Sequence, residues 1–230
     1  MSEQDSPIRI TREALRDGSL IDAARRRVGA GMKLRSDADI AACLDALLAE
    51  HPVGEDVWLF GYGSLMWNPA MHYAERRAGT VRGWHRSYCL WLEMGRGSPE
   101  WPGLMLALDK GGATSGALFR VPATEARDEV MLPFRRELFT ESYDARWVSC
   151  ATRDGPVRAL TFVANRNGPR YAHRLPLDRV ARHIATASGN LGSCLDYLRH
   201  TLGALDELGL DDRMLRAVLR LCVAGASEEC

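Results

Sequence analysis

The stretch Val57-Trp-Leu-Phe-Gly-Tyr-Gly-Ser-Leu-Met-Trp67 predicts a buried strand that runs directly into a tight turn. Val57–Phe60 is a continuous apolar run, typical of a strand buried on both faces, although four residues alone do not exclude a buried helix. Gly61 and Gly63 end the run, because glycine adopts positive φ freely and lets another group approach where a Cβ would stand. The backbone N–H groups of such a turn can converge on one anionic or carbonyl oxygen.

This turn has two interpretations, an ordinary tight turn and a ligand-binding loop, and the residues alone favour neither. Two familiar motifs are excluded. A dinucleotide fingerprint requires a glycine at its sixth position, where Met66 stands. A nucleophile elbow requires glycines two residues before and after its serine, and Tyr62 and Met66 occupy these places. Ser64 is therefore not predicted to be a covalent nucleophile.

The composition is that of an ordinary globular protein of 230 residues, long enough for one large domain. Thirty Lys and Arg residues balance thirty Asp and Glu residues, so no basic face for nucleic acid or an anionic membrane is indicated. No apolar run approaches the ~20 residues that span a bilayer, and the first residues lack the apolar segment of a secretion signal. We therefore expect a cytoplasmic protein without nucleic-acid or membrane partners.

Cysteine and histidine spacing predicts neither disulfides nor a metal site. The six cysteines lie far apart without a Cys-x-x-Cys pair, and the six histidines form no His-x-x-x-His pair. Scattered cysteines of this kind are typical of reduced, mostly buried thiols in a cytosolic protein. No metal and no other cofactor is expected.

Hydrophobic periodicity divides the chain into three parts. Residues 1–55 read as an N-terminal helical extension, residues 56–222 as the main domain with strands to about 165 and helices after, and residues 223–230 as a flexible tail. Ser36 and Asp39 have capping-box spacing before an apolar helical face, so residues 37–50 should pack on the main domain. Disorder of residues 1–30 is the alternative, because consecutive arginines there are more typical of a solvated face.

Two hairpins are predicted in the strand-rich part. Leu104–Leu108 and Ser115–Val121 flank the glycine-containing segment 109–114. Arg146–Ala151 and Val157–Ala164 flank a second turn around Gly155. Each pair combines aliphatic or aromatic runs with turn residues, which is the usual pattern of a hairpin.

The segment Pro133-Phe-Arg-Arg-Glu-Leu-Phe-Thr-Glu-Ser-Tyr143 holds a candidate catalytic carboxylate, Glu137. Thr124 suits the N-cap of a helix through Met131, and Pro133 suits the first turn of a second helix. A carboxylate beside arginines is usually a solvated helix charge, and only a minority have the perturbed pKa of a catalytic group. The residues alone therefore favour the structural role.

Together the two segments resemble the ChaC-type, glutathione-specific γ-glutamylcyclotransferases, and the bacterial branch in particular. The family's Tyr-Gly-Ser-Leu loop stands here as Tyr62–Leu65, and its Arg-Glu pair with a downstream tyrosine as Arg136, Glu137 and Tyr143. The likeness runs from about Val57 to about Leu219.

A third segment, Ala187–Ser193, resembles a turn of the bacterial relatives that could close a pocket, although a helix end followed by an N-cap serine is the favoured interpretation. The chain departs from the family pattern at Glu141, where relatives tend to have glycine, and at Leu104, where they usually have arginine.

The resemblance implies an α+β fold, a small mixed β-barrel surrounded by helices, with the N-terminal helical extension added. It implies the reaction of glutathione to 5-oxoproline and Cys-Gly, with Glu137 as the catalytic residue and no cofactor. The implied substrate-binding residues are those of the turn and one tyrosine: Gly61, Tyr62, Gly63, Ser64, Leu65, Met66 and Tyr143.

The implied reaction requires the protein to position the substrate and to supply one group that carries a proton. Attack of the γ-glutamyl amine on its own side-chain carbonyl is intramolecular, so the substrate must be held folded. One carboxylate can take the amine proton and supply the leaving nitrogen. Apolar walls would raise its pKa, and Phe134, Phe139 and Trp67 are candidates. The turn's N–H groups would hold the amide oxygen or the α-carboxylate.

Two alternatives remain at this point. One is a cyclotransferase for other γ-glutamyl amines or amino acids. The other is a non-catalytic protein that binds a partner and is linked to ion transport, as older family naming suggests.

Overall fold

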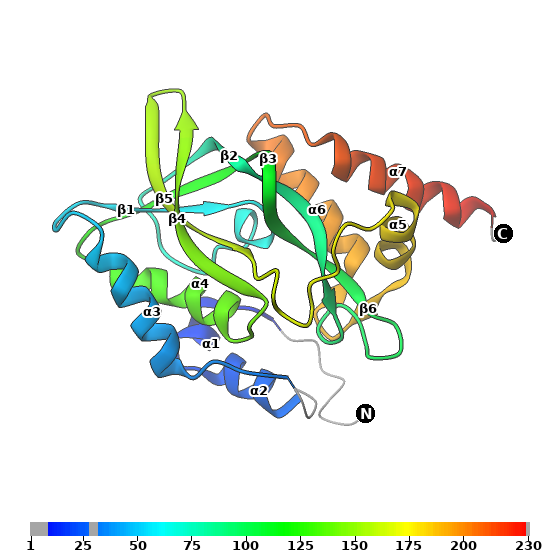
Figure 1. Cartoon of the computed structure of the whole chain (residues 1–230), viewed down its shortest axis with the longest axis horizontal. Coiled ribbons are helices and arrows are strands. Elements are labelled where there is room, and N and C mark those ends of the chain that lie inside the picture. The colour runs from blue at the N-terminus through cyan, green and yellow to red at the C-terminus, as the bar shows by residue number, and fades with distance from the viewer. Residues whose placement is uncertain (1–8, 28–31, 229–230) are drawn as a thin grey trace.

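The computed structural model describes residues 9–27 and 32–228 and contains a closed five-stranded barrel (Figure 1). Strand β1 runs parallel to β5, whereas the pairs β1–β3, β3–β2, β2–β4 and β4–β5 are antiparallel, so the barrel is mixed as expected. In barrel order the strands are β1 (Val57–Gly61), β3 (Gly103–Val121), β2 (Glu75–Leu92), β4 (Tyr143–Thr152) and β5 (Gly155–Ala164).

Strand β1 is the short strand that closes the barrel, between β3 and β5. Val57, Leu59 and Phe60 are at most 2% exposed, which confirms the prediction of a strand buried on both faces. Its partners contribute equally buried side chains, such as Phe119 on β3 and Leu160 on β5. The barrel interior is therefore a packed apolar core, and β1 delivers the glycine turn to one end of it.

The hairpin predicted around residues 109–114 is wrong. That segment lies inside the long strand β3, which pairs with β2 from Arg120 opposite Glu75 to Gly103 opposite Leu92. Gly111 and Gly112 do have positive φ, of 99° and 68°. They bend β3 where the β2 register shifts around Gly83 and do not reverse the chain, as expected of a β-bulge. The second hairpin is confirmed, with Thr152 opposite Gly155, and it projects from the barrel in Figure 1.

Helix α4 (Ala126–Leu138) is one helix where two were predicted, and Pro133 lies inside it. Proline removes one backbone donor and usually destabilises a helix interior. Here the buried side chains Val130, Phe134 and Leu138, all 0% exposed, form one continuous stripe against the core and keep the helix whole. The packing energy of that stripe outweighs the cost of the missing bond.

Helix α3 (Asp37–Ala49) begins with the predicted capping box, in which Ser36 and Asp39 each accept from the other's backbone N–H. It packs against α4, and its buried residues Ile40 and Leu44 join the main core. The predicted docking of this helix on the main domain is confirmed.

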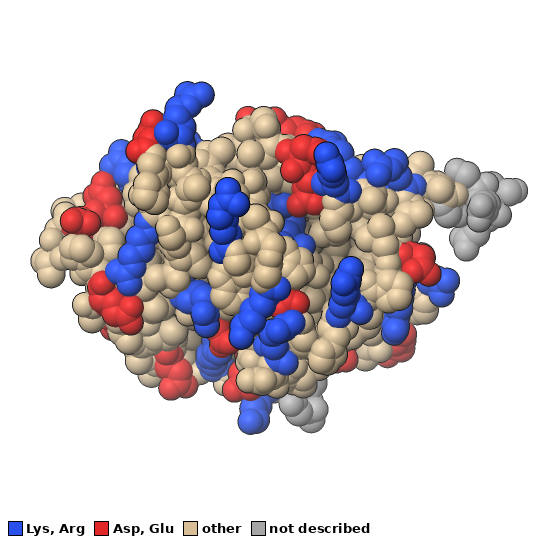
Figure 2. Space-filling view, turned by 45° about the horizontal axis from the view of Figure 1, so that its top comes forward, with Lys and Arg blue, Asp and Glu red and all other residues tan. Residues whose placement is uncertain are grey.

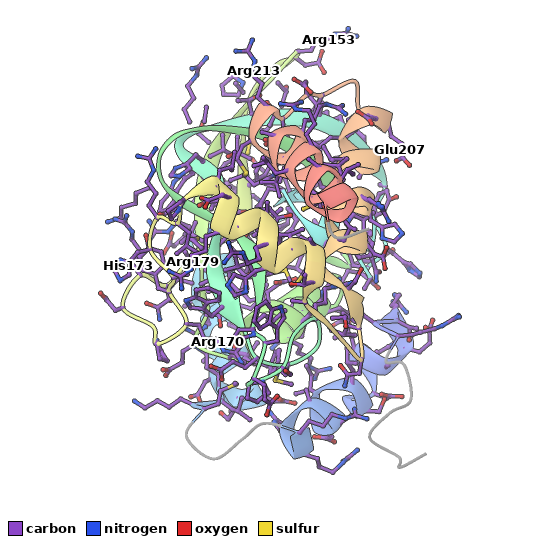
Figure 3. The ribbon with its side chains drawn as sticks, turned by 90° about the vertical axis from the view of Figure 1, so that its right-hand side faces the viewer. Arg153, Arg170, His173, Arg179, Glu207 and Arg213 are labelled. Carbon is purple, nitrogen blue, oxygen red and sulfur yellow. The ribbon has the colours of Figure 1, made fainter. Side chains whose placement is uncertain are left out.

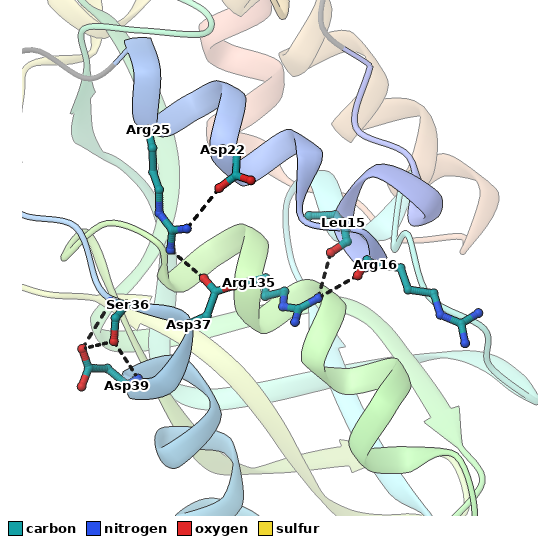
Figure 4. A network of polar contacts seen from close by, with 8 residues as sticks. All are labelled: Leu15, Arg16, Asp22, Arg25, Ser36, Asp37, Asp39 and Arg135. Atoms are coloured by element: carbon teal, nitrogen blue, oxygen red, sulfur yellow. Dashed lines mark hydrogen bonds and ion pairs between the residues drawn. The ribbon is translucent and has the colours of Figure 1, made fainter.

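The rest of the described extension forms α1 (Arg12–Arg16) and α2 (Ser19–Arg27), which lie beside α4. Arg135 of α4 donates to the carbonyl oxygens of Leu15 and Arg16, each at 3.1 Å (Figure 4). Arg25 joins α2 to the start of α3 through an ion pair of 2.6 Å with Asp37. Residues 12–16 and 19–27 are thus helical, against the alternative of disorder, and 1–8 and 28–31 lie outside the described residues.

The last third is helical as predicted, apart from a two-stranded ribbon of β6 (Ser188–Gly189) and β7 (Gly192–Ser193). The helices are α5 (Leu177–Thr186), α6 (Cys194–Glu207) and α7 (Arg213–Glu228). Helix α7 continues to Glu228, well beyond the expected start of a tail at 223, and residues 229–230 lie outside the described residues. None of the helices in the described ranges has both the length and the apolar character needed to cross a membrane.

Two glycines predict opposite effects of one added methyl group. A Cβ at Gly116 would lie 2.3 Å from the carbonyl oxygen of Gly61, so Gly116→Ala should lower the free energy of unfolding by about 1–3 kcal/mol. Gly203 lies inside α6 with nothing within 4 Å, so Gly203→Ala should raise it by up to about 1 kcal/mol. Urea unfolding of both variants checks this. Equal effects would contradict the close packing of β1 on β3.

Candidate active site

A cavity of about 180 Å³ opens between the barrel, the end of α4 and the N-terminal helices. It is lined by side chains from parts of the sequence that lie far apart, and among them are Ser64 of the glycine turn, Glu137 of α4 and Tyr143 of β4. The predicted carboxylate and the predicted turn therefore face one common space. This is the arrangement required by the ring-closure chemistry that the family resemblance implies.

The glycine turn continues from β1 into a short 3₁₀ helix, η2 (Ser64–Met66). A Cβ at Gly63 would lie 2.5 Å from the phenol oxygen of Tyr197, so only glycine fits there without a shift of that ring. The Tyr62 carbonyl accepts a bond of 2.6 Å from Arg86. The turn is therefore held in place from both sides.

Only one of the six predicted turn residues lines the cavity, namely Ser64. Leu65 and Met66 are 4% and 2% exposed and belong to the main core, together with Tyr62. Gly61 and Gly63 give the backbone room, since a Cβ at Gly61 would lie 3.1 Å from the Leu65 Cβ. The turn thus shapes the site, and its contact with the cavity is through the serine.

Arg136 joins the turn to the carboxylate. Its Nη2 donates to Ser64 Oγ at 2.6 Å, its Nη1 donates to the carbonyl oxygen of Asn68 at 2.7 Å, and its Nε lies 3.2 Å from Glu137 Oε1. The arginine side chain is only 8% exposed. A guanidinium has a planar fork of donors, which suits it to hold several acceptors in fixed positions.

Glu137 is a shielded carboxylate, with 15% of its side-chain surface exposed. Burial raises the pKa of this carboxyl above its ordinary value, and the Arg136 charge opposes that shift. Trp67 and Phe139 line the cavity as predicted. Phe134 does not, which corrects the expectation; it is fully buried and packs edge-on against Phe162 with ring centroids 5.2 Å apart.

Three tyrosines surround the carboxylate. Burial, and next to it the charge of Glu137, raises the pKa of Tyr197 to about 12. The pKa values of Tyr62 and Tyr143 are also raised, first by burial. All three are therefore neutral hydrogen-bond donors near pH 7, and Tyr143 donates to the carbonyl oxygen of Leu106 at 2.9 Å.

The predicted N-cap serine of the segment Ala187–Ser193 is confirmed, whereas the predicted glycine C-cap is wrong, because α5 is capped at Ala187 and the glycines lie in the β6–β7 ribbon. Asn190 and Leu191, at the tip of the β6–β7 ribbon, line the cavity. Ser193 is the N-cap of α6 and accepts from the Asp196 N–H at 2.9 Å. The ribbon is fastened to the opposite loop, because the Leu191 N–H donates to the Gly95 carbonyl at 2.7 Å.

Two groups of cavity residues were missed by sequence reasoning. Ile10, Leu20, Ile21 and Ala24 of the extension form an apolar roof; their only signal was a mixed apolar and polar pattern. Two arginines, Arg96 and Arg170, also line the cavity. Nothing in the sequence around them distinguishes them from the exposed basic residues, which Figure 2 shows interspersed with acidic side chains.

The two departures from the family pattern lie outside the cavity. Leu104 is fully buried in the core. Glu141 lines a neighbouring cavity of about 220 Å³ that shares Thr140, Ser142 and Arg170 with the first one. Among the described residues there is no group of three or more His, Cys, Asp or Glu side chains that could hold a metal ion.

Comparison with known proteins identifies the family of this chain. The sequence model of the family described as "ChaC-like protein" matches residues 57–224. The chain belongs to the ChaC-like family. The match begins at the first residue of β1, so the helical extension lies outside it.

This ChaC-like protein is 42% identical over 180 residues to the glutathione-specific γ-glutamylcyclotransferase of Escherichia coli, covering 78% of each chain. It is 33% identical over 147 residues to the mouse glutathione-specific γ-glutamylcyclotransferase 1, covering 62% of this chain and 66% of the mouse protein. A solved γ-glutamylcyclotransferase from yeast, specific to glutathione, superimposes with a TM-score of 0.66 at 19% identity, covering 74% of this chain and 96% of the yeast chain. That likeness confirms the barrel fold.

The contact between Gly63 and Tyr197 predicts a non-additive pair of substitutions. Gly63→Ala should lower the free energy of unfolding by about 1–3 kcal/mol, because the new methyl group meets the phenol oxygen. In a Tyr197→Phe background that oxygen is gone and the next ring atom is 3.7 Å away, so the same change should cost much less. A double-mutant cycle measured by urea unfolding gives the coupling. Additive effects would show that the turn and the ring do not touch.

Proposed function

We propose that this ChaC-like protein is a glutathione-specific γ-glutamylcyclotransferase in which Glu137 is the general base and then the general acid. The observation that carries the proposal is the position of Glu137, a shielded carboxylate with a raised pKa that faces the same cavity as the glycine turn. The names of the bacterial and mouse relatives point to the same reaction.

The proposed role of Glu137 follows from the proton balance of ring closure. The γ-glutamyl amine arrives as an ammonium and must lose a proton before its nitrogen attacks the side-chain carbonyl. The C–N bond to cysteine then breaks, and the departing nitrogen takes up a proton. A single carboxylate beside both nitrogens serves both steps, and a pKa raised toward neutrality improves it as an acid without preventing it from acting as a base.

The substrate-binding residues predicted from the sequence have two kinds of role in this proposal. Ser64 and Tyr143 line the cavity and are candidates for direct contact with the substrate. Gly61, Tyr62, Gly63, Leu65 and Met66 fix the turn that presents Ser64. Negative charge on the amide oxygen would be stabilised by donors that line the cavity, namely the Arg136 guanidinium and the neutral Tyr197 phenol.

A cytoplasmic location fits this proposal, because glutathione is a thiol and the cytosol keeps thiols reduced. The five cysteines within the described residues carry free thiols. Burial raises the pKa of Cys89 and Cys150 to about 12, so these two are unreactive.

Replacement of the carboxylate tests the mechanism. Glu137→Gln should reduce the formation of 5-oxoproline from glutathione by at least about 100-fold, because an amide cannot carry the proton. The variant should remain folded, since Arg136 keeps its bonds to Ser64 and Asn68. Asp128→Asn, an equal charge change on an exposed residue of the same helix, is the matched control and should be fully active.

Comparison of substrates distinguishes the alternatives. The wild type should release 5-oxoproline from glutathione and much less from γ-Glu-Ala. Release from γ-Glu-Ala alone would support a cyclotransferase of other substrates. No release from either would leave the partner-binding alternative. A Glu137→Gln variant with wild-type rate would show that another group moves the proton.

The raised pKa of Glu137 predicts the acid limb of the pH profile. As the pH falls through that pKa the carboxylate becomes protonated and can no longer accept the amine proton, so kcat/KM should decrease. The midpoint should lie above the ~4.3 of an exposed glutamate. Because the Arg136 charge lowers this pKa, Arg136→Gln should move the limb to higher pH. A limb at or below the ordinary value would contradict the shielding of Glu137.

A further inference from the structure

The cavity contains more positive charge than its own side chains neutralise. One of its three arginines, Arg136, forms an ion pair with a described carboxylate, that of Glu137. Within the described part of the chain, neither Arg96 nor Arg170 forms an ion pair with a carboxylate. A shielded cation without a counter-charge is costly, and it is expected where an anionic ligand supplies the missing charge.

Arg170 is the more distinctive of these two cations. It is half-buried on the loop that follows β5, and the polar contact of its guanidinium is a bond of 2.9 Å to the thioether sulfur of Met32, a weak acceptor. Burial lowers the pKa of Arg170, and the charge of Glu93 opposes this from beyond ion-pair distance. In Figure 3 Arg170 lies between the barrel and the N-terminal helices, whereas Arg153 reaches outward.

The two arginines have different neighbours in the cavity. Arg96 lies over the ring of Tyr197, with its guanidinium carbon 5.5 Å from the ring centroid, and Tyr197 is one of the tyrosines around Glu137. Arg96 also donates to the Ser193 carbonyl at 2.8 Å. Arg170 interacts with Glu93 and, on the side of the catalytic carboxylate, with Tyr143. Arg170 lines the neighbouring cavity as well, so it lies where the two cavities meet.

The distribution of charge in glutathione matches this arrangement. The amine and the α-carboxylate belong to the reacting γ-glutamyl group and must stay beside Glu137. The glycyl carboxylate lies two residues beyond the bond that breaks, about 7 Å away in an extended chain. It therefore needs a cation at some distance from the catalytic carboxylate, on the path that leads out of the site.

We propose that Arg170 binds the glycyl carboxylate of glutathione and so selects the tripeptide over shorter γ-glutamyl compounds. This inference rests on the proposed function and adds the residue that recognises the part of the substrate farthest from the reaction. Arg170 is a specificity-determining residue and takes no part in the proton transfer.

The test compares glutathione with its glycyl monoethyl ester, in which the recognised charge is absent. The wild type should prefer glutathione by about tenfold or more in kcat/KM, the usual worth of a charged hydrogen bond. Arg170→Gln should lose that preference, mainly through a higher KM for glutathione, with the ester turned over at the wild-type rate. Arg170→Lys should restore part of it. Arg174→Gln, an exposed arginine of the same loop, should behave as the wild type.

The outcomes separate the two levels of the proposal. A loss of activity that is equal for glutathione and the ester, or no loss in Arg170→Gln, would overturn the role of Arg170 and leave the cyclotransferase proposal standing. Absence of 5-oxoproline from the wild type with either substrate would overturn the proposed function itself. If Arg170→Gln fails to fold, as judged by its thermal transition, the substrate preference of Arg170→Lys and of the wild type still decides the question.

Discussion

The three contacts of the Arg136 guanidinium hold the site together, because they connect elements that lie far apart in the sequence. The arginine binds the serine of the glycine turn, a carbonyl just after the turn, and the carboxylate next to it on α4. The turn position depends on β1, and the α4 position depends on the apolar stripe that packs on the barrel. The planar guanidinium, with its donors in fixed positions, holds the turn and the end of α4 in one arrangement.

The charge of the same arginine also limits how far burial raises the pKa of the carboxyl group. Apolar neighbours alone would favour the neutral acid at neutral pH, whereas an adjacent cation alone would keep the carboxylate ionised and make it a poor acid. Glu137 experiences both influences, with burial the larger. The three phenols around it are neutral and add no charge.

Local patterns predicted the parts of this structure that local forces determine. The β1 strand, the Ser36 cap and the β4–β5 hairpin were readable because a continuous apolar run, a hydroxyl three residues before a carboxylate, and a two-residue turn each act over a few residues. Gly111–Gly112 and Pro133 were misread because the partner strand β2 and the core stripe of α4, both distant in sequence, decide what those residues do. The site carboxylate and the turn came from family resemblance. The roof and Arg170 depend on tertiary contacts that no single segment shows.

The roof residues belong to a part of the chain that the family match does not include. A fragment starting at β1 would retain the turn, the arginine fork and the carboxylate, yet it would expose the cavity to bulk water. Its local dielectric constant would rise, and interactions among the charged groups would weaken. Family members with the same barrel but different leading segments would then differ in reactivity although their reacting groups are identical, since the solvent around those groups is set by residues outside the barrel.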